Sequence, residues 1–330
     1  MRTFLSMILA LATTGCCSTL PKLADKHVVF HANVPLYDHV TESRDVWRDD
    51  ARQRDVPVTI YKPEGAREKL PIVVFSHGIG EDRDSYVYLG RALARAGYLA
   101  VHVTHAGTDR AVLKRGYRFL YRAVKQKENW VARPRDVSFV LDRLQARDDV
   151  DMQRIAIVGH SAGAFTAFAL AGIRMVGEAG LAPPENGRWA KAHRSTDLAD
   201  ARVRVAVAMS MPRMDGVVVD GGYDAIAIPV LNMTGTCDTS LIYRTFPRHR
   251  RIPFDSTHAK QQYLVTMKGV NHNTFVEEDK RNTQIAQITI AFLDAYLRND
   301  TTARAWFDDA GIGDVGNVRV SVERKIENAR

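Results

Sequence analysis

The sequence predicts an α/β protein with a doubly wound, mostly parallel sheet of about eight strands and helices on both faces. Three observations lead to this class. Short apolar runs alternate with helix-forming segments along most of the chain, which favours parallel strands joined by right-handed crossovers. The run at residues 71–76 is continuously apolar, as expected for a strand covered on both faces. At residues 155–163, an apolar run ends in a glycine-flanked serine, and helix-forming residues follow.

The elements follow one another in a regular order. Residues 56–61 alternate in polarity as a half-exposed strand does, and residues 84–97 have the apolar spacing of a helix. The tail from residue 301 is polar, and residues 318–322 are expected to form a small edge strand. The remaining expected strands are 98–104, 155–158, 203–209, 228–234 and 262–267. The remaining helices are 164–170, 284–297 and one whose apolar part is 137–144.

Size and composition favour one globular domain. The chain has 330 residues, of which 45% are hydrophobic and 25% charged, enough for a large core. No internal repeat and no Pro/Gly/Ser linker divides it. We therefore expect one domain over residues 18–330. The segment around 177–200, rich in Gly, Pro, Arg and Ala, is expected to be a flap-like insertion.

The first 17 residues have the features of a secretory signal peptide. Residues 4–12 are apolar but too few to span a bilayer, and small residues follow them. The pair Gly15 and Cys16 resembles the end of a bacterial lipoprotein signal, in which the cysteine is lipidated. This predicts an exported protein, periplasmic or anchored through Cys16 to a membrane of a bacterial envelope. The alternative is an uncleaved apolar N-terminal helix.

The chain has three cysteines, and two of them, Cys16 and Cys17, lie in the targeting segment. One cysteine then remains in the folded body, which predicts that no disulfide forms within it. Cys237 is expected to be a small buried apolar residue.

The formal net charge is +8, and much of the positive charge lies at residues 115–135 and 244–251. Such clusters can attract anionic lipid heads, acidic polymers or nucleic acid, but they are more often a solvated rim without a dedicated partner. No helix-turn-helix, zinc-finger or RNA-binding signature is present, so we expect no nucleic-acid partner.

The serine at the end of the 155–163 run is a candidate nucleophile. Gly159 and Gly163 flank Ser161 at the spacing of a sharp strand-to-helix turn, where a larger side chain would clash. Such a turn lifts the hydroxyl clear of the sheet and places it near a helix N-terminus, where negative charge is tolerated. The alternative is an ordinary tight turn with an incidental serine.

A serine hydroxyl needs a base, and candidates for the partners follow it in the chain. Asp238 comes shortly after the strand at 228–234, and His272 comes shortly after the strand at 262–267. Both are therefore expected at the sheet edge that carries Ser161. His272 would act as general base and then general acid, and Asp238 would orient and stabilise its ring.

Other residues compete for these roles. The alternative for Asp238 is a turn residue that bonds local amides, and for His272 a histidine satisfied by backbone. His249 and His258 lie in a basic segment with few strand signals and are weaker candidates. The rival carboxylates, none of which directly follows a clear strand, are Asp215, Asp220, Asp224 and Asp255.

Two backbone amides are candidates for an oxyanion hole. The N–H of Ala162 comes directly after the serine, and the N–H of Ile79 lies in the loop that follows the strand at 71–76. Gly78 and Gly80 would let this loop turn its amides towards a substrate, although a strand-end turn also needs glycine for its dihedral angles. We expect His77 to orient the loop rather than to act as a second base. His160 is expected to pack locally.

No metal or cofactor site is expected. The histidines and acidic residues do not fall at the spacing of common zinc sites. Neither a dinucleotide-binding nor a phosphate-binding glycine motif is present, which weighs against the nucleotide-binding doubly wound proteins.

Four motifs resemble those of a known group: residues 75–80, 159–163, 232–238 and 270–272. The chain is similar there to the predicted dienelactone-hydrolase group, which is related to platelet-activating-factor acetylhydrolases in the α/β-hydrolase superfamily. The similarity covers roughly residues 45–298. It implies an α/β-hydrolase fold and a serine esterase with a Ser161, Asp238 and His272 triad and amide donors at Ile79 and Ala162. True dienelactone hydrolases use a cysteine, so a serine favours ordinary carboxylic esters over lactones.

The leading hypothesis is therefore an exported serine hydrolase that cleaves a small-molecule or lipid carboxylic ester through an acyl-enzyme. An amidase or peptidase could use the same triad. A non-catalytic envelope protein could use the same fold to bind a ligand, because a fold alone does not prove activity.

Overall fold

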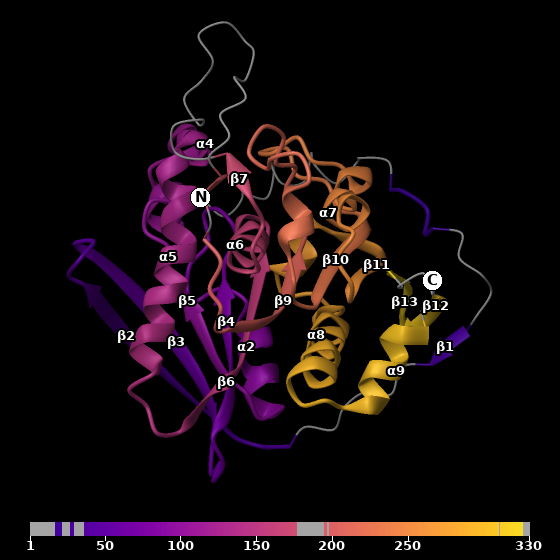
Figure 1. Ribbon diagram of the computed structural model, residues 1–330, viewed down its shortest axis with the longest axis horizontal. Helices are drawn as coiled ribbons and strands as arrows, with labels where there is room; N and C mark the ends of the chain where they lie inside the picture. The colour runs from indigo at the N-terminus through magenta and orange to yellow at the C-terminus, as the bar shows by residue number, and fades with distance from the viewer. Residues whose placement is uncertain are drawn as a thin grey trace, which may run out of the picture.

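A computed structural model describes residues 17–21, 27–29, 36–176, 195–196, 198–309 and 311–325. Within this part of the chain, eleven strands form one sheet in the order β1-β12-β13-β11-β10-β9-β6-β4-β5-β3-β2 (Figure 1). The strands are β1 (His27–Val29), β2 (Val40–Asp49), β3 (Arg54–Pro63), β4 (Leu70–Ser76), β5 (Leu99–Val103), β6 (Val150–His160), β9 (Val203–Met209), β10 (Val230–Cys237), β11 (Gln262–Asn271), β12 (Gly311–Val315) and β13 (Val318–Arg324).

The predicted fold class is confirmed. Along the run β5-β4-β6-β9-β10-β11, each strand is parallel to the next. Antiparallel pairs join β5 to β3, β3 to β2, β11 to β13 and β13 to β12 on either side of this run. The expected number of about eight strands is too low, because β1, β2 and β12 were not expected. β13 is not an edge strand, since it lies between β11 and β12.

Helices cover both faces of the sheet (Figure 1). One core packs under α2, α8 and α9, and a second core packs under α5 and α6. Nearly all side chains of β4 and of the second half of β6 are buried, as a strand covered on both faces requires. The helices are α2 (Val87–Arg95), α3 (Arg110–Lys114), α4 (Tyr117–Lys125), α5 (Lys127–Leu144), α6 (Ala162–Leu170), α7 (Ile252–Ser256), α8 (Asn282–Leu297) and α9 (Thr301–Asp309).

The basic segment at residues 115–135 is more helical than its sequence suggests. It contains α4 and the first half of α5, the helix whose apolar part was expected at residues 137–144. Pro134 lies inside α5, where a residue without an N–H normally indicates a break. Few residues of α4 are buried, so the apolar periodicity is faint among its charges.

The expectation for Cys237 was wrong. Cys237 forms a disulfide with Cys17, 220 residues away in the sequence. The backbone N–H of Ser18 donates a hydrogen bond to the carbonyl oxygen of Thr236 (2.8 Å), which fixes this N-terminal segment beside the end of β10. Chain order gives no sign of such a contact, because it depends on where the N-terminal segment runs across the folded body.

Two further expectations concern residues outside those described. They are the signal peptide at residues 1–17, of which only residue 17 is described, and most of the flap, since residues 177–194 and 197 are not described. In the described part, a short two-stranded sheet pairs β7 (Met175–Val176) with β8 (Ser195–Thr196). Among the described helices, none is both long enough and apolar enough to cross a bilayer.

The carboxyl ends of four parallel strands meet at one edge of the sheet. β4 ends at Ser76, β6 at His160, β10 at Cys237 and β11 at Asn271. The next residue in each of these segments enters a loop or turn at that edge, where ligands bind in open α/β sheets.

Candidate active site

Ser161 occupies a strained turn between β6 and α6. Its backbone has φ 55° and ψ −116°, a conformation that a residue with a side chain rarely adopts. The flanking glycines are required by space. A Cβ on Gly159 would collide with the carbonyl of Gly163, and a Cβ on Gly163 would collide with the carbonyl of Ser76. The glycine spacing in the sequence therefore predicted this turn correctly.

The structure brings Ser161, His272 and Asp238 together. The Oγ of Ser161 lies 3.2 Å from Nε2 of His272, and Nδ1 of His272 lies 3.0 Å from Oδ1 of Asp238. His272 begins the short 3₁₀ helix η4 (His272–Phe275) directly after β11, and Asp238 directly follows β10. These are the contacts that a nucleophile, a base and an orienting carboxylate need.

The rival residues take other partners. Asp224 bonds to His258 at 2.9 Å, and Asp215 forms an ion pair with Arg213. Asp238 is the one of the five candidate carboxylates that contacts His272.

Asp238 is fully buried and held in its ionised form. It accepts hydrogen bonds from the hydroxyls of Ser210 (2.5 Å) and Thr234 (2.8 Å), and Nη2 of Arg250 lies 2.8 Å from its Oδ1. Burial raises the pKa of this carboxyl, but the charge of Arg250 and the bond to His272 outweigh it. The pKa of Asp238 is therefore well below its usual range.

Arg250 is a site residue that the sequence did not reveal. Its side chain is completely buried, and Nη1 donates to the carbonyl oxygens of Ser210 (2.7 Å) and Met211 (2.8 Å). Its Nη2 also lies 3.1 Å from Nδ1 of His272. In the sequence, Arg250 is one of several cations at residues 244–251, a cluster expected to be a solvated rim.

The ring of His272 is kept neutral by its surroundings. Burial lowers the pKa of His272, the bond to Asp238 raises it, and the charge of Arg250 lowers it again. The net pKa lies below the ordinary value of 6.5. At neutral pH the ring is therefore free to accept a proton.

His160 packs behind the base, as expected. Its buried ring lies 4.6 Å from the ring of His272 and 5.3 Å from that of Phe275, and its Nδ1 lies 2.8 Å from the hydroxyl of Tyr86. The same hydroxyl accepts a hydrogen bond from the N–H of Gly78 at 3.3 Å. Tyr86 thus connects the wall behind His272 to the loop at residues 77–80.

The loop after β4 lies against the serine turn. A methyl group placed on Gly78 would be 3.4 Å from Cβ of Ser161. Gly80 has φ 80°, and its N–H donates to the carbonyl of Thr108 at 2.8 Å. Ala162 begins α6, where backbone amides have no partner within the helix. Both predicted amide donors thus belong to segments next to Ser161.

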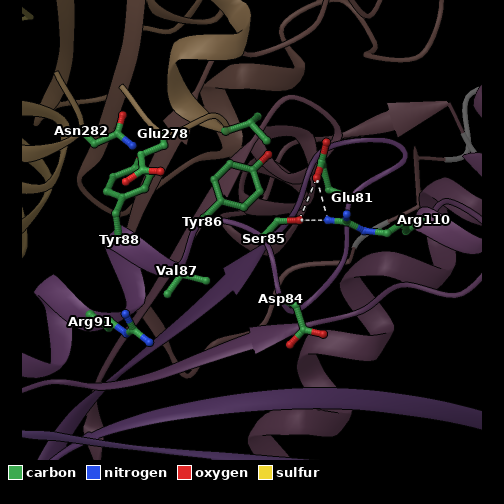
Figure 2. A pocket seen from close by; sticks show the side chains of 11 residues that line it. Glu81, Asp84, Ser85, Tyr86, Val87, Tyr88, Arg91, Arg110, Glu278 and Asn282 are labelled. Atoms are coloured by element: carbon green, nitrogen blue, oxygen red, sulfur yellow. Dashed lines mark hydrogen bonds and ion pairs between the residues drawn. The ribbon is translucent and has the colours of Figure 1, made fainter. Parts of the chain in front are cut away.

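A hollow of about 470 Å³ lies between segments that continue from the site. Figure 2 shows Glu81 and Ser85, just after the loop, facing Arg110, with Tyr86 and Tyr88 along the wall. Val276, directly after η4, lines the hollow as well. It has both polar and apolar walls, and none of Ser161, Asp238 and His272 lines it.

A parallel sheet covered on both faces, a serine on a strained turn after the central strand, and an acid and a histidine after two later strands define the α/β-hydrolase class. Residues 52–133 match the family model described as platelet-activating factor acetylhydrolase, isoform II. The match confirms the resemblance seen in the sequence and supports a hydrolase of the lipase/esterase type. It spans the loop at residues 76–80 and ends before Ser161.

Proposed function

We propose that this protein is an exported serine hydrolase that cleaves carboxylic esters through an acyl-enzyme. The observation that carries this proposal is the continuous contact from Ser161 through His272 to the buried carboxylate of Asp238. The substrate class is a small-molecule or lipid ester, in keeping with the family match.

In the first half-reaction, Nε2 of His272 accepts the proton of Ser161 while Oγ attacks the ester carbonyl. The oxyanion of the tetrahedral intermediate accepts hydrogen bonds from the N–H groups of Ala162 and Ile79. His272 then donates its proton to the departing alcohol, and the bond from the carbonyl carbon to the leaving oxygen breaks.

In the second half-reaction, water replaces Ser161 as the nucleophile and Ser161 becomes the leaving group. His272 takes a proton from water, the resulting hydroxide attacks the acyl-enzyme, and Ser161 regains its proton as the acid leaves. Asp238 stays ionised throughout and holds Nδ1–H of His272. Arg250 and the two hydroxyls that contact Asp238 support this, because together they keep its pKa low.

Export is supported by the disulfide between Cys17 and Cys237, because such bonds persist mainly in oxidising compartments. We place the cleavage of the signal peptide before Cys16. This keeps Cys17 in the mature chain and leaves Cys16 as the lipidated terminus. Metabolic labelling with a fatty acid tests the anchor, since a Cys16→Ser variant should lose the label and be released from the membrane fraction.

The activity is tested with p-nitrophenyl esters of increasing chain length and with a fluorophosphonate probe. We expect hydrolysis and covalent labelling of the wild-type protein, both lost in Ser161→Ala. Matched ester and amide substrates separate an esterase from an amidase. A folded wild-type protein that neither labels nor hydrolyses any ester would instead be a binding protein on this fold.

A further inference from the structure

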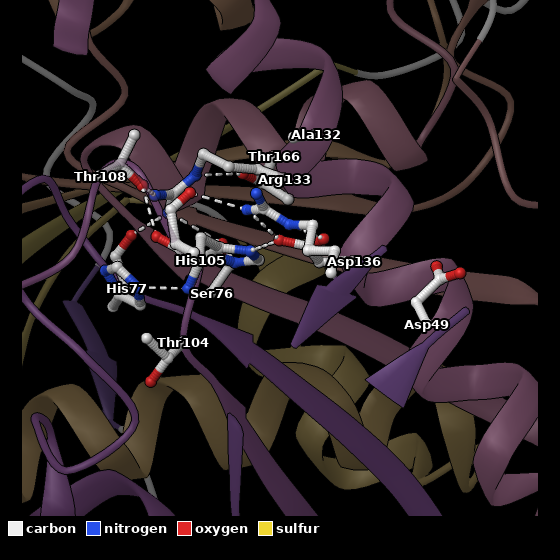
Figure 3. A network of polar contacts seen from close by, with 12 residues as sticks. Asp49, Ser76, His77, Thr104, His105, Thr108, Ala132, Arg133, Asp136 and Thr166 are labelled. Atoms are coloured by element: carbon white, nitrogen blue, oxygen red, sulfur yellow. Dashed lines mark hydrogen bonds and ion pairs between the residues drawn. The ribbon is translucent and has the colours of Figure 1, made fainter. Parts of the chain in front are cut away.

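A second polar cluster lies buried below the loop at residues 77–80, and Arg133 is at its centre (Figure 3). Arg133 projects from α5 and is 1% exposed. Its Nη2 donates to the carbonyl oxygen of His77 and to Oγ of Ser76 (3.1 Å). Its Nη1 donates to Thr108 (2.7 Å) and its Nε to Thr166 (3.1 Å). Burial lowers the pKa of Arg133 to about 10, so the side chain stays charged at neutral pH.

The hydrogen bonds of this cluster form a series in which each group donates to the next, from Arg133 to Asp136. Because Ser76 accepts from Arg133, its own O–H points to Nε2 of His105, 2.9 Å away. The proton of His105 is then on Nδ1, which lies 3.0 Å from Oδ2 of Asp136. Asp136 is in turn held by Arg52 and Arg54, each at 2.8 Å.

The cluster ends at His77. The backbone N–H of His105 donates to Nε2 of His77 at 3.0 Å, so the proton of His77 lies on Nδ1. That proton is donated to the carbonyl oxygen of Gly78 at 2.6 Å. His77 is completely buried, and burial and the charge of Arg133 hold its pKa well below the ordinary value. Both the ring and the carbonyl of His77 are therefore fixed.

Fixing these two carbonyls fixes the amides that follow them. In a planar trans peptide, the C=O and the next N–H point in opposite directions. The carbonyl of His77 points to Arg133, so the N–H of Gly78 points the other way and reaches Tyr86. The carbonyl of Gly78 points to the ring of His77, so the N–H of Ile79 points away from that ring.

The cluster is not a second catalytic centre, although hydrogen bonds connect a serine, a histidine and an aspartate in it. Ser76, His105 and Asp136 are fully buried, and Ser76 lies in β4 rather than on an exposed turn. Its oxygen accepts from a guanidinium, which withdraws electron density and opposes nucleophilic attack. A substrate therefore has no access to Ser76.

We infer that Arg133, with Ser76, His105 and Asp136, positions the N–H of Ile79 for the oxyanion by locking His77. This inference rests on the proposed function and adds positioning residues to it. Electrostatic stabilisation of an oxyanion depends on donors that are already oriented, so loosening the lock should lower kcat rather than raise KM.

The test compares Arg133→Lys with Tyr98→Phe. A lysine lacks the planar fork that serves the His77 carbonyl, Ser76, Thr108 and Thr166 together. Tyr98→Phe removes a buried bond to Asp294 (2.6 Å) between the base of the sheet and α8, and it serves as the stability control. We expect Arg133→Lys to lower kcat roughly 10- to 100-fold with little change in KM.

Two further readouts separate positioning from general damage. Affinity for a trifluoromethyl ketone, which forms a tetrahedral oxyanion on the serine, should fall in Arg133→Lys by the same factor as kcat. Amide hydrogen exchange at residues 77–80 should speed up in that variant and not in Tyr98→Phe. His77→Gln, which keeps a side-chain amide near Gly78 but loses the ring, provides a second test if Arg133→Lys does not fold.

The inference is overturned if a folded Arg133→Lys or His77→Gln protein keeps the kcat, the inhibitor affinity and the loop exchange of Tyr98→Phe. If the wild-type protein shows no ester hydrolysis at all, the proposed function fails. Hydrogen exchange then still reports whether the cluster orders the loop.

Discussion

The described part of the fold contains two hydrogen-bonded relays, each formed by a serine, a histidine and an aspartate, and their hydrogen-bond distances are nearly the same. In the first relay, His272 lies 3.2 Å from Ser161 and 3.0 Å from Asp238. In the second, buried relay, His105 lies 2.9 Å from Ser76 and 3.0 Å from Asp136. Hydrogen-bond geometry alone therefore does not tell which serine is the nucleophile.

Backbone conformation and access distinguish the two. Ser161 sits at φ 55° on the turn after β6, and the side chain of His272 is 18% exposed. Ser76 lies in a strand, and the side chain of His105 is 0% exposed. The oxygen of Ser76 also accepts from Arg133, whereas the oxygen of Ser161 lies beside Nε2 of His272 at the carboxyl edge of the sheet. Ser161 is 3% exposed and Ser76 is 0% exposed. Only a relay whose serine a substrate can reach can act as a catalytic site, whereas a fully buried relay such as that of Ser76 contributes to the structure.

The aspartates differ in how their charge is balanced. Asp238 pairs with one completely buried arginine, Arg250, which also contacts His272. Asp136 pairs with Arg52 and Arg54, whose side chains are 22% and 21% exposed. Arg250 therefore adjusts the proton affinity of His272 in the first relay. In the second relay, Arg52 and Arg54 connect α5 to the turn between β2 and β3 and to the start of β3.

The largest difference between the relays should appear when each serine is removed. Ser161→Ala should lower kcat at least about 10⁴-fold and abolish fluorophosphonate labelling, because it removes the nucleophile. Ser76→Ala should keep the labelling and lose only about 10-fold in kcat, because it weakens the positioning of the loop. Steady-state hydrolysis of a p-nitrophenyl ester measures both. Loss of labelling in a folded Ser76→Ala protein would contradict the positioning role of Ser76.

Replacing the aspartates should separate activity from stability. Asp238→Asn should lower kcat about 10⁴-fold, because the wrong tautomer of His272 is then favoured. Asp136→Asn should cost about 3–5 kcal/mol of unfolding free energy, because it leaves Arg52 and Arg54 without their buried partner. Denaturant unfolding and active-site-normalised kcat are the two measurements. If both variants lost the same activity per labelled site, the two aspartates would not differ in role as expected.

Removing the arginine of the first relay should move the pH profile. In Arg250→Met, His272 loses a cation that lowers its pKa and keeps the carboxylate of Asp238, while the ring of His160 packs beside it as before. The pKa of His272 should therefore rise, and the acid limb of kcat/KM should shift up by about 1 pH unit. Arg248→Met, in the same basic segment, is the control. An unchanged acid limb in folded Arg250→Met would contradict the assigned role.

The smallest effect concerns the pH dependence of stability from the buried relay. Burial lowers the pKa of His105 from the ordinary 6.5 to about 4. Between these values the unfolded chain binds the proton and the folded chain does not, so the unfolding free energy falls as pH drops from 6.5 towards 4. His105→Gln should flatten this slope in denaturant titrations at several pH values. A slope in His105→Gln as steep as that of the wild-type protein would contradict a lowered pKa for His105, because the other buried histidines contribute equally in both proteins.

Much of this site followed from local pattern and chain order. The glycines around Ser161 specify the turn, because a Cβ on either would collide with backbone. Asp238 and His272 were predictable because each follows an apolar strand, and parallel strands end at one edge of the sheet. The placement of Ile79 beside the serine turn followed from the same rule.

The folded structure alone decided which charged residues are buried and which distant segments meet. In the sequence, Arg133 and Arg250 look like their neighbours Arg122 and Arg248, yet both are 1% exposed and hold the site together. The cysteine pair 17 and 237, the extra strands β1, β2 and β12, and the second relay all depend on segments far apart in the chain. A charged side chain is buried only where such segments bring enough hydrogen-bond partners to replace water, and no local pattern records those partners.

The amino-acid order by itself thus determined the class of fold and the meeting of Ser161, Asp238 and His272, because steric rules and strand polarity act locally. Only the tertiary structure distinguished this group from the buried group of Ser76, His105 and Asp136, because access to solvent and the source of each balancing charge are properties of the packed molecule.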